Sequence, residues 1–238
     1  MSKLNPELFS EGINYRFSDI SMLENALNHS SYSNERNLPY TANNERLEFL
    51  GDAVLELIVS RFIFTHNPDM PEGNMTTLRA SLVCEQSLAD AARQIGLEQY
   101  VRLGRGEEKT GGRHRDSILS DAFEAVIGAI YLDGGLEEAE RFVTTYILTD
   151  IESKSLYHDC KSKLQEIVQE FFHENSDIAY EVIEETGPAH AKIFTVSCRI
   201  QGHEFSVGTA HTKKKAEQEA AYKTLVRIKD KDLPSLLS

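Results

Sequence analysis

Four carboxylates stand at helical spacing in two segments that are otherwise apolar. Glu48 and Asp52 are four residues apart, and Asp121 and Glu124 are three residues apart, so each pair falls on one face of a helix. Burying an unpaired carboxylate in such surroundings carries a free-energy penalty on the order of several kcal/mol, as for any desolvated ion. A bound divalent cation removes that penalty, and oxygen ligands favour a hard cation such as Mg²⁺. The pattern therefore predicts a metal site built from four carboxylates.

The same acids could instead pair with arginines or cap helices, and for either pair alone this alternative stays open. Few basic residues lie nearby in the sequence, however. They are Arg46 and Arg61 near the first pair, and Arg113 and Arg115 near the second. Two acidic pairs with so few basic neighbours favour a Mg²⁺ site, in which Mn²⁺ could substitute.

The first 150 residues carry apolar side chains at helical period and show no convincing alternating strands, which predicts an all-α domain. Prolines and glycines separate the predicted helices. These helices span residues 19–27, 45–64, 74–83, 86–95, 117–132 and 136–151. The hydrophilic run 104–115 predicts a mobile loop. It does not match the glycine-rich phosphate loop of nucleotide-binding proteins, so no nucleotide cofactor is expected.

The pattern changes after this domain, which we place at residues 1–152. Residues 153–158 lack periodicity and suit a linker, residues 159–228 form a second domain, and residues 229–238 form a C-terminal tail. Within the second domain, a helix at 160–172 precedes alternating runs at 179–185, 192–200 and 204–209, and a helix at 213–227 follows. This α-β-β-β-α order predicts a small α+β domain of the kind that binds double-stranded RNA.

The formal net charge of −13 argues against a nucleic-acid partner, because affinity for phosphate usually comes from Lys and Arg. The charge is unevenly distributed, however. Residues 1–157 contain 14 basic and 25 acidic residues, whereas residues 158–228 contain 9 and 11. An acidic metal-binding domain joined to a locally basic one remains compatible with RNA, with weak binding expected in the absence of Mg²⁺.

Several segments resemble the ribonuclease III family. Residues Glu45 to Leu55 are similar to its signature motif, and Gly111 to Gly135 to its second acidic segment. Leu27 to Tyr32 and Pro71 to Gly73 match as well, and a domain similar to the double-stranded-RNA-binding domain follows. The resemblance covers nearly the whole chain, in the order and spacing of the bacterial enzyme.

The resemblance implies a Mg²⁺-dependent endonuclease that hydrolyses both strands of double-stranded RNA. Its products would carry 5′-phosphate and 3′-hydroxyl ends with short 3′ overhangs. Family biology implies processing of ribosomal RNA precursors and maturation of messenger and small RNAs. Asp52 and Glu124 would be the catalytic residues. The metal-site residues would be Glu48, Asp52, Asp121 and Glu124.

Three further residues in the first domain take roles from the same resemblance. Phe49 matches an aromatic residue that packs into the partner subunit of a homodimer, although core packing is the usual role of such a side chain. Glu45 and Glu72 match acids near the cleft. From the residues alone, charges that favour the helix macrodipole explain these two acids equally well.

A-form RNA offers phosphates and the 2′-hydroxyls of a shallow minor groove, so contacts should follow one face of the second domain. The first helix, the segment 187–190 and the start of the last helix match the family's three contact regions. A lysine triplet alone is more often a solvated face, but here it begins a helix, where phosphate is favoured. The RNA-binding residues would be Ser162, Gln165, Gln169, His190, Lys213, Lys214 and Lys215.

The remaining features favour a reduced cytoplasmic protein without a membrane partner. No segment reaches the roughly 18 apolar residues of a membrane-spanning helix, and the start lacks the apolar run of a signal peptide. Cys84, Cys160 and Cys198 are odd in number and widely separated, so neither a disulfide framework nor a zinc site is indicated.

Two other hypotheses compete with that of an enzyme acting on double-stranded RNA. The first is a non-catalytic scaffold that binds double-stranded RNA and has lost its metal site, but all four carboxylates are present. The second is a metal-dependent phosphohydrolase that acts on small molecules, which leaves the second domain unexplained.

Overall fold

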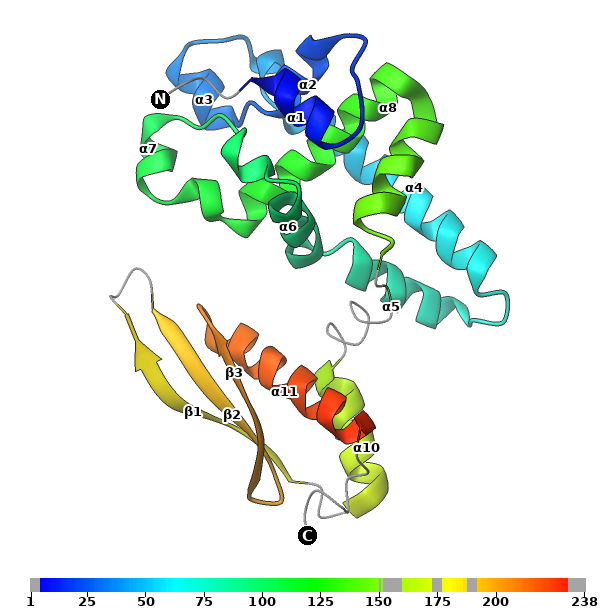
Figure 1. The fold of residues 1–238 in the computed structure, drawn as a ribbon, viewed down its shortest axis with the longest axis vertical. Helices are drawn as coiled ribbons and strands as arrows, with labels where there is room; N and C mark the ends of the chain where they lie inside the picture. Colours follow the sequence, from blue (N-terminus) through cyan, green and yellow to red (C-terminus); the bar gives the residue numbers. More distant parts are fainter. Residues whose placement is uncertain (1–4, 150, 152–159, 173–176, 188–191, 231–238) are drawn as a thin grey trace. The chain divides into compact units, whose positions relative to one another are not determined.

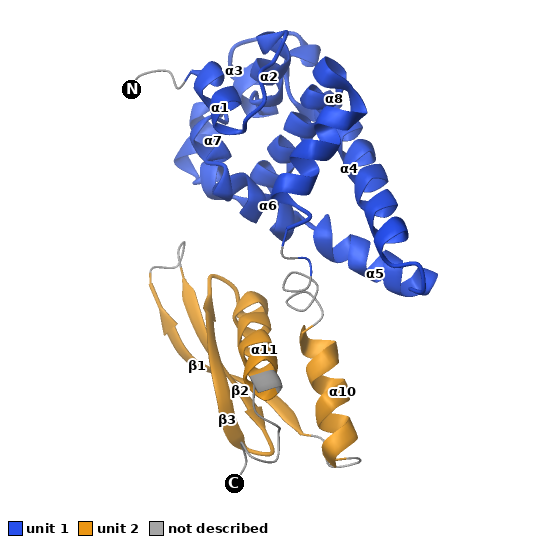
Figure 2. Ribbon diagram, turned by 45° about the vertical axis from the view of Figure 1, so that its right-hand side comes forward, with its two compact units in different colours: residues 1–151 blue, residues 152–238 orange. Residues whose placement is uncertain are grey.

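The computed structural model describes residues 5–149, 151, 160–172, 177–187 and 192–230 (Figure 1). The chain forms two compact units, residues 1–151 and 152–238 (Figure 2). The predicted linker at 153–158 lies outside the described residues, as does the predicted tail from 231 onward. No helix in the described residues combines the length and apolar character needed to cross a membrane.

The first unit consists of helices, which confirms the all-α prediction for this domain. Its α-helices are α1 (Pro6–Gly12), α2 (Ile20–Ala26), α3 (Ser30–Glu35), α4 (Glu45–His66), α5 (Glu72–Leu82), α6 (Glu85–Gln94), α7 (Arg105–Lys109) and α8 (Asp116–Tyr146). Three short 3-10 helices join them: η1 (Tyr40–Ala42), η2 (Leu97–Gln99) and η3 (Gly112–His114).

Helix α8 is the centre of this unit, and α4 lies along it (Figure 1). Its side chains Leu119, Phe123, Val126 and Ile127 are fully buried, because α2, α4 and α6 cover it on several sides. The predicted break after residue 132 falls at Gly135, whose φ of 82° and ψ of −178° are accessible mainly to glycine. The central helix therefore bends at that residue and ends at Tyr146.

The hydrophilic segment 104–115 was predicted as a mobile loop, and this prediction was wrong. It contains α7 and η3, and its Arg113 guanidinium is held in place. That group donates to the carbonyl oxygens of Glu98 at 2.6 Å and Val101 at 2.9 Å, and it pairs with Glu108. Glu98 and Val101 lie outside the segment, so its composition alone did not indicate these contacts.

The second unit has the predicted α-β-β-β-α order, which confirms the small α+β domain. Its elements are α10 (Cys160–Phe172), β1 (Ile178–Thr186), β2 (Ile193–Ile200), β3 (His203–Ala210) and α11 (Lys213–Asp230). The strands form one antiparallel sheet in the order β1-β2-β3, and both helices cover the same face (Figure 2).

The core of the second unit lies between that sheet face and the two helices. Leu164 and Val168 of α10 meet Cys198 and Ile200 of β2, and all four are fully buried. Gly208 lets β3 approach α11, because a Cβ there would lie 2.1 Å from the carbonyl oxygen of Ala216. This packing fixes the start of α11 beside the end of β3.

Candidate functional site

Two glycines allow α4 and α8 to cross in direct backbone contact. A Cβ on Gly51 would lie 1.8 Å from the carbonyl oxygen of Glu124, and one on Gly128 would lie 2.3 Å from that of Leu47. No larger residue fits at such distances unless the helices move apart. Glycine patterning did not reveal this role in the sequence. The crossing places the backbone of Glu124 beside the turn of α4 that carries Glu48.

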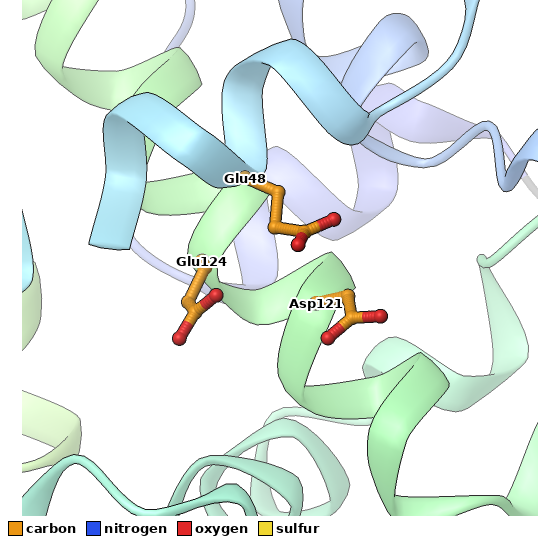
Figure 3. Close-up of side chains that lie close together, drawn as sticks. All are labelled: Glu48, Asp121 and Glu124. Carbon is orange, nitrogen blue, oxygen red and sulfur yellow. The ribbon is translucent and has the colours of Figure 1, made fainter. Parts of the chain in front are cut away.

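Three of the predicted metal-site carboxylates meet at this crossing. Figure 3 shows Glu48 extending from α4, and Asp121 and Glu124 extending from α8. One carboxylate oxygen from each lies within 4.8 Å of the others, and each residue is partly buried. Helical spacing explains the geometry, because residues three apart on α8 share a face that Glu48 then approaches from the other helix.

Three of the four arginines near these acids in the sequence pair with other residues. Arg61, Arg113 and Arg115 form ion pairs outside the cluster, with Glu140, Glu108 and Glu107 respectively. Within the described part of the chain, no basic side chain forms an ion pair with the three clustered carboxylates. The alternative in which arginines neutralise these acids therefore does not match the structure.

Burial and mutual repulsion raise the pKa values of the clustered acids. Burial, together with the smaller effects of the charges of Asp52, Asp121 and Glu48, raises the pKa of Glu124 to about 8. Burial likewise raises the pKa of Glu48 to about 7, assisted by Asp121, Glu45 and Asp52. Burial also raises the pKa of Asp121. A divalent cation would reverse this situation, because it favours the deprotonated form of each ligand.

Asp52 lies beside this group of three. Its side chain is exposed, and its charge raises the pKa of both Glu48 and Glu124. Asp52 is one helical turn after Glu48 and so lies on the same face of α4, but it is not part of the group of three. The structure thus brings three of the four predicted ligands together and places the fourth at the exposed side.

Glu45 and Glu72, the two other acids predicted near the cleft, lie on different helices. Glu45 is in the first turn of α4 and is near enough for its charge to raise the pKa of Glu48. Glu72 is in the first turn of α5 and accepts a hydrogen bond from Thr76 Oγ1 of its own helix at 3.0 Å. The structure therefore links Glu45 to the cluster, whereas the contact found for Glu72 is local.

His29 lies near the cluster from another element. Its positive form would lower the pKa of Asp121, and this effect partly offsets the larger rise due to burial. The Nδ1 atom of His29 is 2.7 Å from Ser31 Oγ, which accepts a hydrogen bond from the amide of Gly104. The sequence offered no signal of the closeness of His29 to Asp121.

Phe49 is on the outer side of α4 and is 81 % exposed. Leu57 and Phe64 follow it at intervals of about two helical turns and are 56 % and 70 % exposed. Buried residues such as Val54 and Ile58 occupy the opposite side of the helix. Helix α4 thus carries an exposed apolar stripe, defined here as Phe49, Leu57 and Phe64, which is typical of a protein interface.

In the second unit, Ser162, Gln165 and Gln169 are exposed along one side of α10. Leu164 and Val168 of the same helix are fully buried on the other side. The predicted minor-groove residues therefore share a solvent-facing surface, as contact with a duplex requires.

Lys213, Lys214 and Lys215 are exposed in the first turn of α11. Lys213 already has a partner within the protein, because its Nζ atom lies 3.1 Å from a carboxylate oxygen of Glu185. This pairing was missed in the sequence, since the two residues are far apart along the chain. His190, also predicted to contact RNA, lies outside the described residues.

Two protein-family models match the chain, and together they cover most of it. Residues 19–151 match the model described as ribonuclease-III-like. Residues 160–227 match the model of the double-stranded RNA binding motif. The boundary between the two matches falls at the junction of the two compact units.

Relatives and solved structures agree with these matches. Ribonuclease 3 of Staphylococcus aureus is 46% identical over 222 residues, which is 91% of this chain and 90% of that protein. Two structures of the nuclease domain of ribonuclease III from Campylobacter jejuni are similar to this chain. The first structure is described as showing structural flexibility in a region involved in dimer formation. It has a TM-score of 0.56 at 41% identity, and the match covers 60% of this chain and 96% of the Campylobacter chain. The other, at 2.2 Å resolution, has a TM-score of 0.55 at 39% identity, with 62% and 95% covered.

The family matches and the identity to the relatives thus extend over nearly the full length of the chain, through the helical unit and the RNA-binding motif. This chain belongs to the ribonuclease III family and joins the nuclease domain of that family to a double-stranded-RNA-binding domain.

Proposed function

We propose that this protein is a Mg²⁺-dependent endoribonuclease that hydrolyses both strands of double-stranded RNA to 5′-phosphate and 3′-hydroxyl ends. The observation that carries the proposal is the meeting of Glu48, Asp121 and Glu124 within 4.8 Å, in a chain that also has an RNA-binding unit. A non-catalytic scaffold would not require three partly buried carboxylates that form no ion pair with Lys or Arg among the described residues of its helical unit.

The donor set fits a hard divalent cation. Glu48, Asp121 and Glu124 would hold it, with Asp52 at the exposed side of the cluster. Carboxylate oxygens without histidine or cysteine favour Mg²⁺, and Mn²⁺ as a substitute, over zinc. When bound, such a metal activates a water molecule, neutralises the phosphoryl oxygens and stabilises the leaving 3′ oxygen.

The residues of the chain provide the rigid frame for this chemistry. The close contact at Gly51 and Gly128 fixes the distance between α4 and α8, and therefore between Glu48 and Glu124. Partial burial excludes water from the inner side of the cluster and raises the pKa values of the acids. Asp52, exposed beside them, is placed to accept a hydrogen bond from a water molecule that approaches from solvent.

We also propose that the protein is a homodimer that assembles through the apolar stripe of α4. Phe49, Leu57 and Phe64 expose more than half of their surface, and a second copy of the same stripe would cover them in a twofold arrangement. The region involved in dimer formation that is described for the Campylobacter domain supports a dimer, though it does not name the surface. Two sites related by a twofold axis would suit cleavage of the two RNA strands.

The proposed RNA surface combines the exposed side of α10 with the start of α11. Gln165 and Gln169 would reach the minor groove, and the lysines at 213–215 would contact phosphates. The family also suggests biological roles, namely ribosomal RNA precursor processing and the maturation of messenger and small RNAs in the cytoplasm. These roles are proposals from the family relationship.

A cleavage assay on a long RNA duplex tests the proposal. The wild-type protein should cut the duplex in Mg²⁺ or Mn²⁺, leave it intact in EDTA, and give products with 5′-phosphate ends. Glu124→Gln should abolish cleavage and leave duplex binding nearly unchanged, because Glu124 would ligate the metal without holding RNA.

Glu137→Gln is the matched control, since Glu137 is an exposed acid on the same helix and should cut normally. Retained turnover by Glu124→Gln at saturating Mg²⁺ would refute its catalytic role. A wild-type protein that binds the duplex tightly and never cuts it would favour the non-catalytic scaffold.

A further inference from the structure

The carboxylate of Glu185 bridges two lysines at one end of the sheet in the second unit. Its Oε2 atom lies 2.9 Å from Nζ of Lys192, and its Oε1 atom lies 3.1 Å from Nζ of Lys213. The three residues come from different elements: Glu185 is near the end of β1, Lys192 directly precedes β2, and Lys213 begins α11. Each carboxylate oxygen therefore serves one ammonium group.

An aromatic ring lies next to both ammonium groups. Phe194 is paired with Glu185 across β1 and β2, and its ring centroid is 5.9 Å from Nζ of Lys192 and 5.3 Å from Nζ of Lys213. Both ammonium groups are thus within cation–π distance of the same ring. The lysine side chains are 47% and 55% exposed, so a ligand from solvent can reach them.

The carboxylate of Glu185 resembles an RNA phosphate in its charge. A phosphodiester carries a single negative charge shared by two non-bridging oxygens, as a carboxylate does, and lysine ammonium groups bind both kinds of anion. The Glu185 bridge is exposed at the surface, where ion pairs contribute little and exchange readily. A backbone phosphate can therefore replace the carboxylate without disturbing the core of the unit.

We propose that Lys192 and Lys213 form a phosphate-binding site for double-stranded RNA, and that Glu185 occupies this site in the free protein. RNA then binds here only by displacing an anion that belongs to the protein itself. The inference rests on the proposed recognition of double-stranded RNA. It adds Lys192 to the RNA contacts and assigns to Glu185 the role of an internal competitor that lowers affinity.

The test measures binding of the full-length protein to a short RNA duplex by fluorescence anisotropy, in EDTA and across a salt series. Glu185→Gln should bind about 3- to 10-fold more tightly than the wild type and show a steeper salt dependence, because both lysines become free for phosphate. Glu184→Gln is the control. It removes the same charge from the neighbouring position of β1, where the side chain is exposed and forms no ion pair among the described residues, so its gain should be smaller.

Lys192→Ala separates an RNA contact from a mere partner of Glu185. It should weaken binding in the wild-type background, and it should weaken binding more strongly in the Glu185→Gln background, where Lys192 has no competing carboxylate. Loss of its effect in that background would show that Lys192 touches only Glu185.

Equal affinities and salt slopes for Glu185→Gln and Glu184→Gln would overturn the proposal, as would weaker binding by Glu185→Gln than by the wild type. If no variant bound the duplex at all, the proposed recognition of RNA would itself fail, and this inference would fail with it. Duplex binding by the wild type without a specific effect at Glu185 would overturn the inference alone.

Discussion

The proposed metal site of one unit and the proposed RNA surface of the other differ in how their acidic side chains are paired. The nuclease unit brings three partly buried carboxylates together, with which no Lys or Arg among the described residues forms an ion pair. The RNA-binding unit has no such cluster among its described residues, and several of its lysines pair with acids at the surface. Its ion pairs include Glu185 with Lys192 and Lys213, as well as Lys161–Glu217 and Lys223–Glu219.

This difference indicates how each unit would accept its partner. The carboxylate cluster would take up a cation from outside, and its geometry is set by the packing of two helices. Overpacking there costs typically about 1–3 kcal/mol, and sometimes more. In the proposed RNA surface, Lys192 and Lys213 would give up the Glu185 carboxylate to bind phosphate, and exposed ion pairs are worth roughly 0–1 kcal/mol each. We therefore expect larger effects from changes at the helix crossing than from changes at the RNA surface.

The largest effect is expected when the helix crossing itself is forced apart. Gly51→Ala places a methyl group where the carbonyl oxygen of Glu124 now lies. This change should destabilise the nuclease unit by about 3 kcal/mol or more, as overpacking of a tight contact does, and it should abolish duplex cleavage. Urea unfolding followed by circular dichroism measures the loss.

Gly73→Ala on α5 is the control for that change, because a Cβ there meets nothing within 4 Å. It should be neutral or stabilising by up to about 1 kcal/mol, since alanine favours helices over glycine. Equal stability of the Gly51→Ala and wild-type proteins would mean that the two helices tolerate separation.

The next largest effect is expected at the apolar stripe of α4, where no charged group is involved. Phe49→Ala should weaken the proposed dimer by about 2–3 kcal/mol, as truncation of a large buried aromatic does. Sedimentation at several protein concentrations measures the dissociation constant. Leu8→Ala, which removes an exposed apolar residue from α1, should leave it unchanged. A wild-type monomer at micromolar concentration would contradict the assembly.

Much of this arrangement was predictable from the sequence, because it depends on short-range periodicity. The spacing of Glu48, Asp121 and Glu124 placed them on helix faces, and the alternating runs after residue 178 indicated three strands. The short helices α1 and α3, of seven and six residues, were not predicted, although α2 of seven residues was.

What the sequence did not indicate depends on contacts between distant segments. The two glycines at the helix crossing, the carbonyl partners of Arg113 and the bridge from Glu185 to Lys213 all join residues that periodicity does not connect. The position of Asp52 outside the group of three depends on side-chain direction at a helix crossing. Local residue patterns contain no information on that direction.

A smaller effect should appear when the metal-free cluster is titrated. In the folded chain, burial raises the pKa of Glu124 to about 8 and that of Glu48 to about 7, above the ordinary value of a carboxyl group. The folded state therefore binds more protons than the unfolded state between about pH 4.5 and pH 8. The contribution of these two protonated carboxyl groups to the stability of the fold is fully present below their ordinary pKa, and it is lost as the pH rises through their pKa values in the folded chain.

Thermal unfolding in EDTA should show this loss as a lower melting temperature at about pH 8 than at about pH 5, and Mg²⁺ should raise the melting temperature more at the higher pH. Glu124→Gln cannot ionise, so it should stabilise the metal-free protein at about pH 8 by roughly 1–2 kcal/mol, a value discounted for partial exposure. Glu137→Gln should leave the profile unchanged. A flat profile for the metal-free wild type would argue against the clustered burial of these acids.

The smallest effect is expected at the lysines that begin α11. Replacing Lys213 and Lys214 with alanine should weaken duplex binding equally for all sequences and reduce its salt slope by roughly one phosphate contact per lysine. The maximal cleavage rate at saturating RNA in low salt should change little, because the clustered carboxylates belong to the other unit. Measuring affinity across a salt series, and then single-turnover cleavage at saturation, separates binding from the cleavage rate.

Of the single variants Lys213→Ala and Lys214→Ala, the second should weaken duplex binding more, since Lys213 is already engaged by Glu185 in the free protein. An unchanged salt slope would mean that the triplet is only a solvated face, and the exposed side of α10 around Gln165 would then be the main contact with RNA.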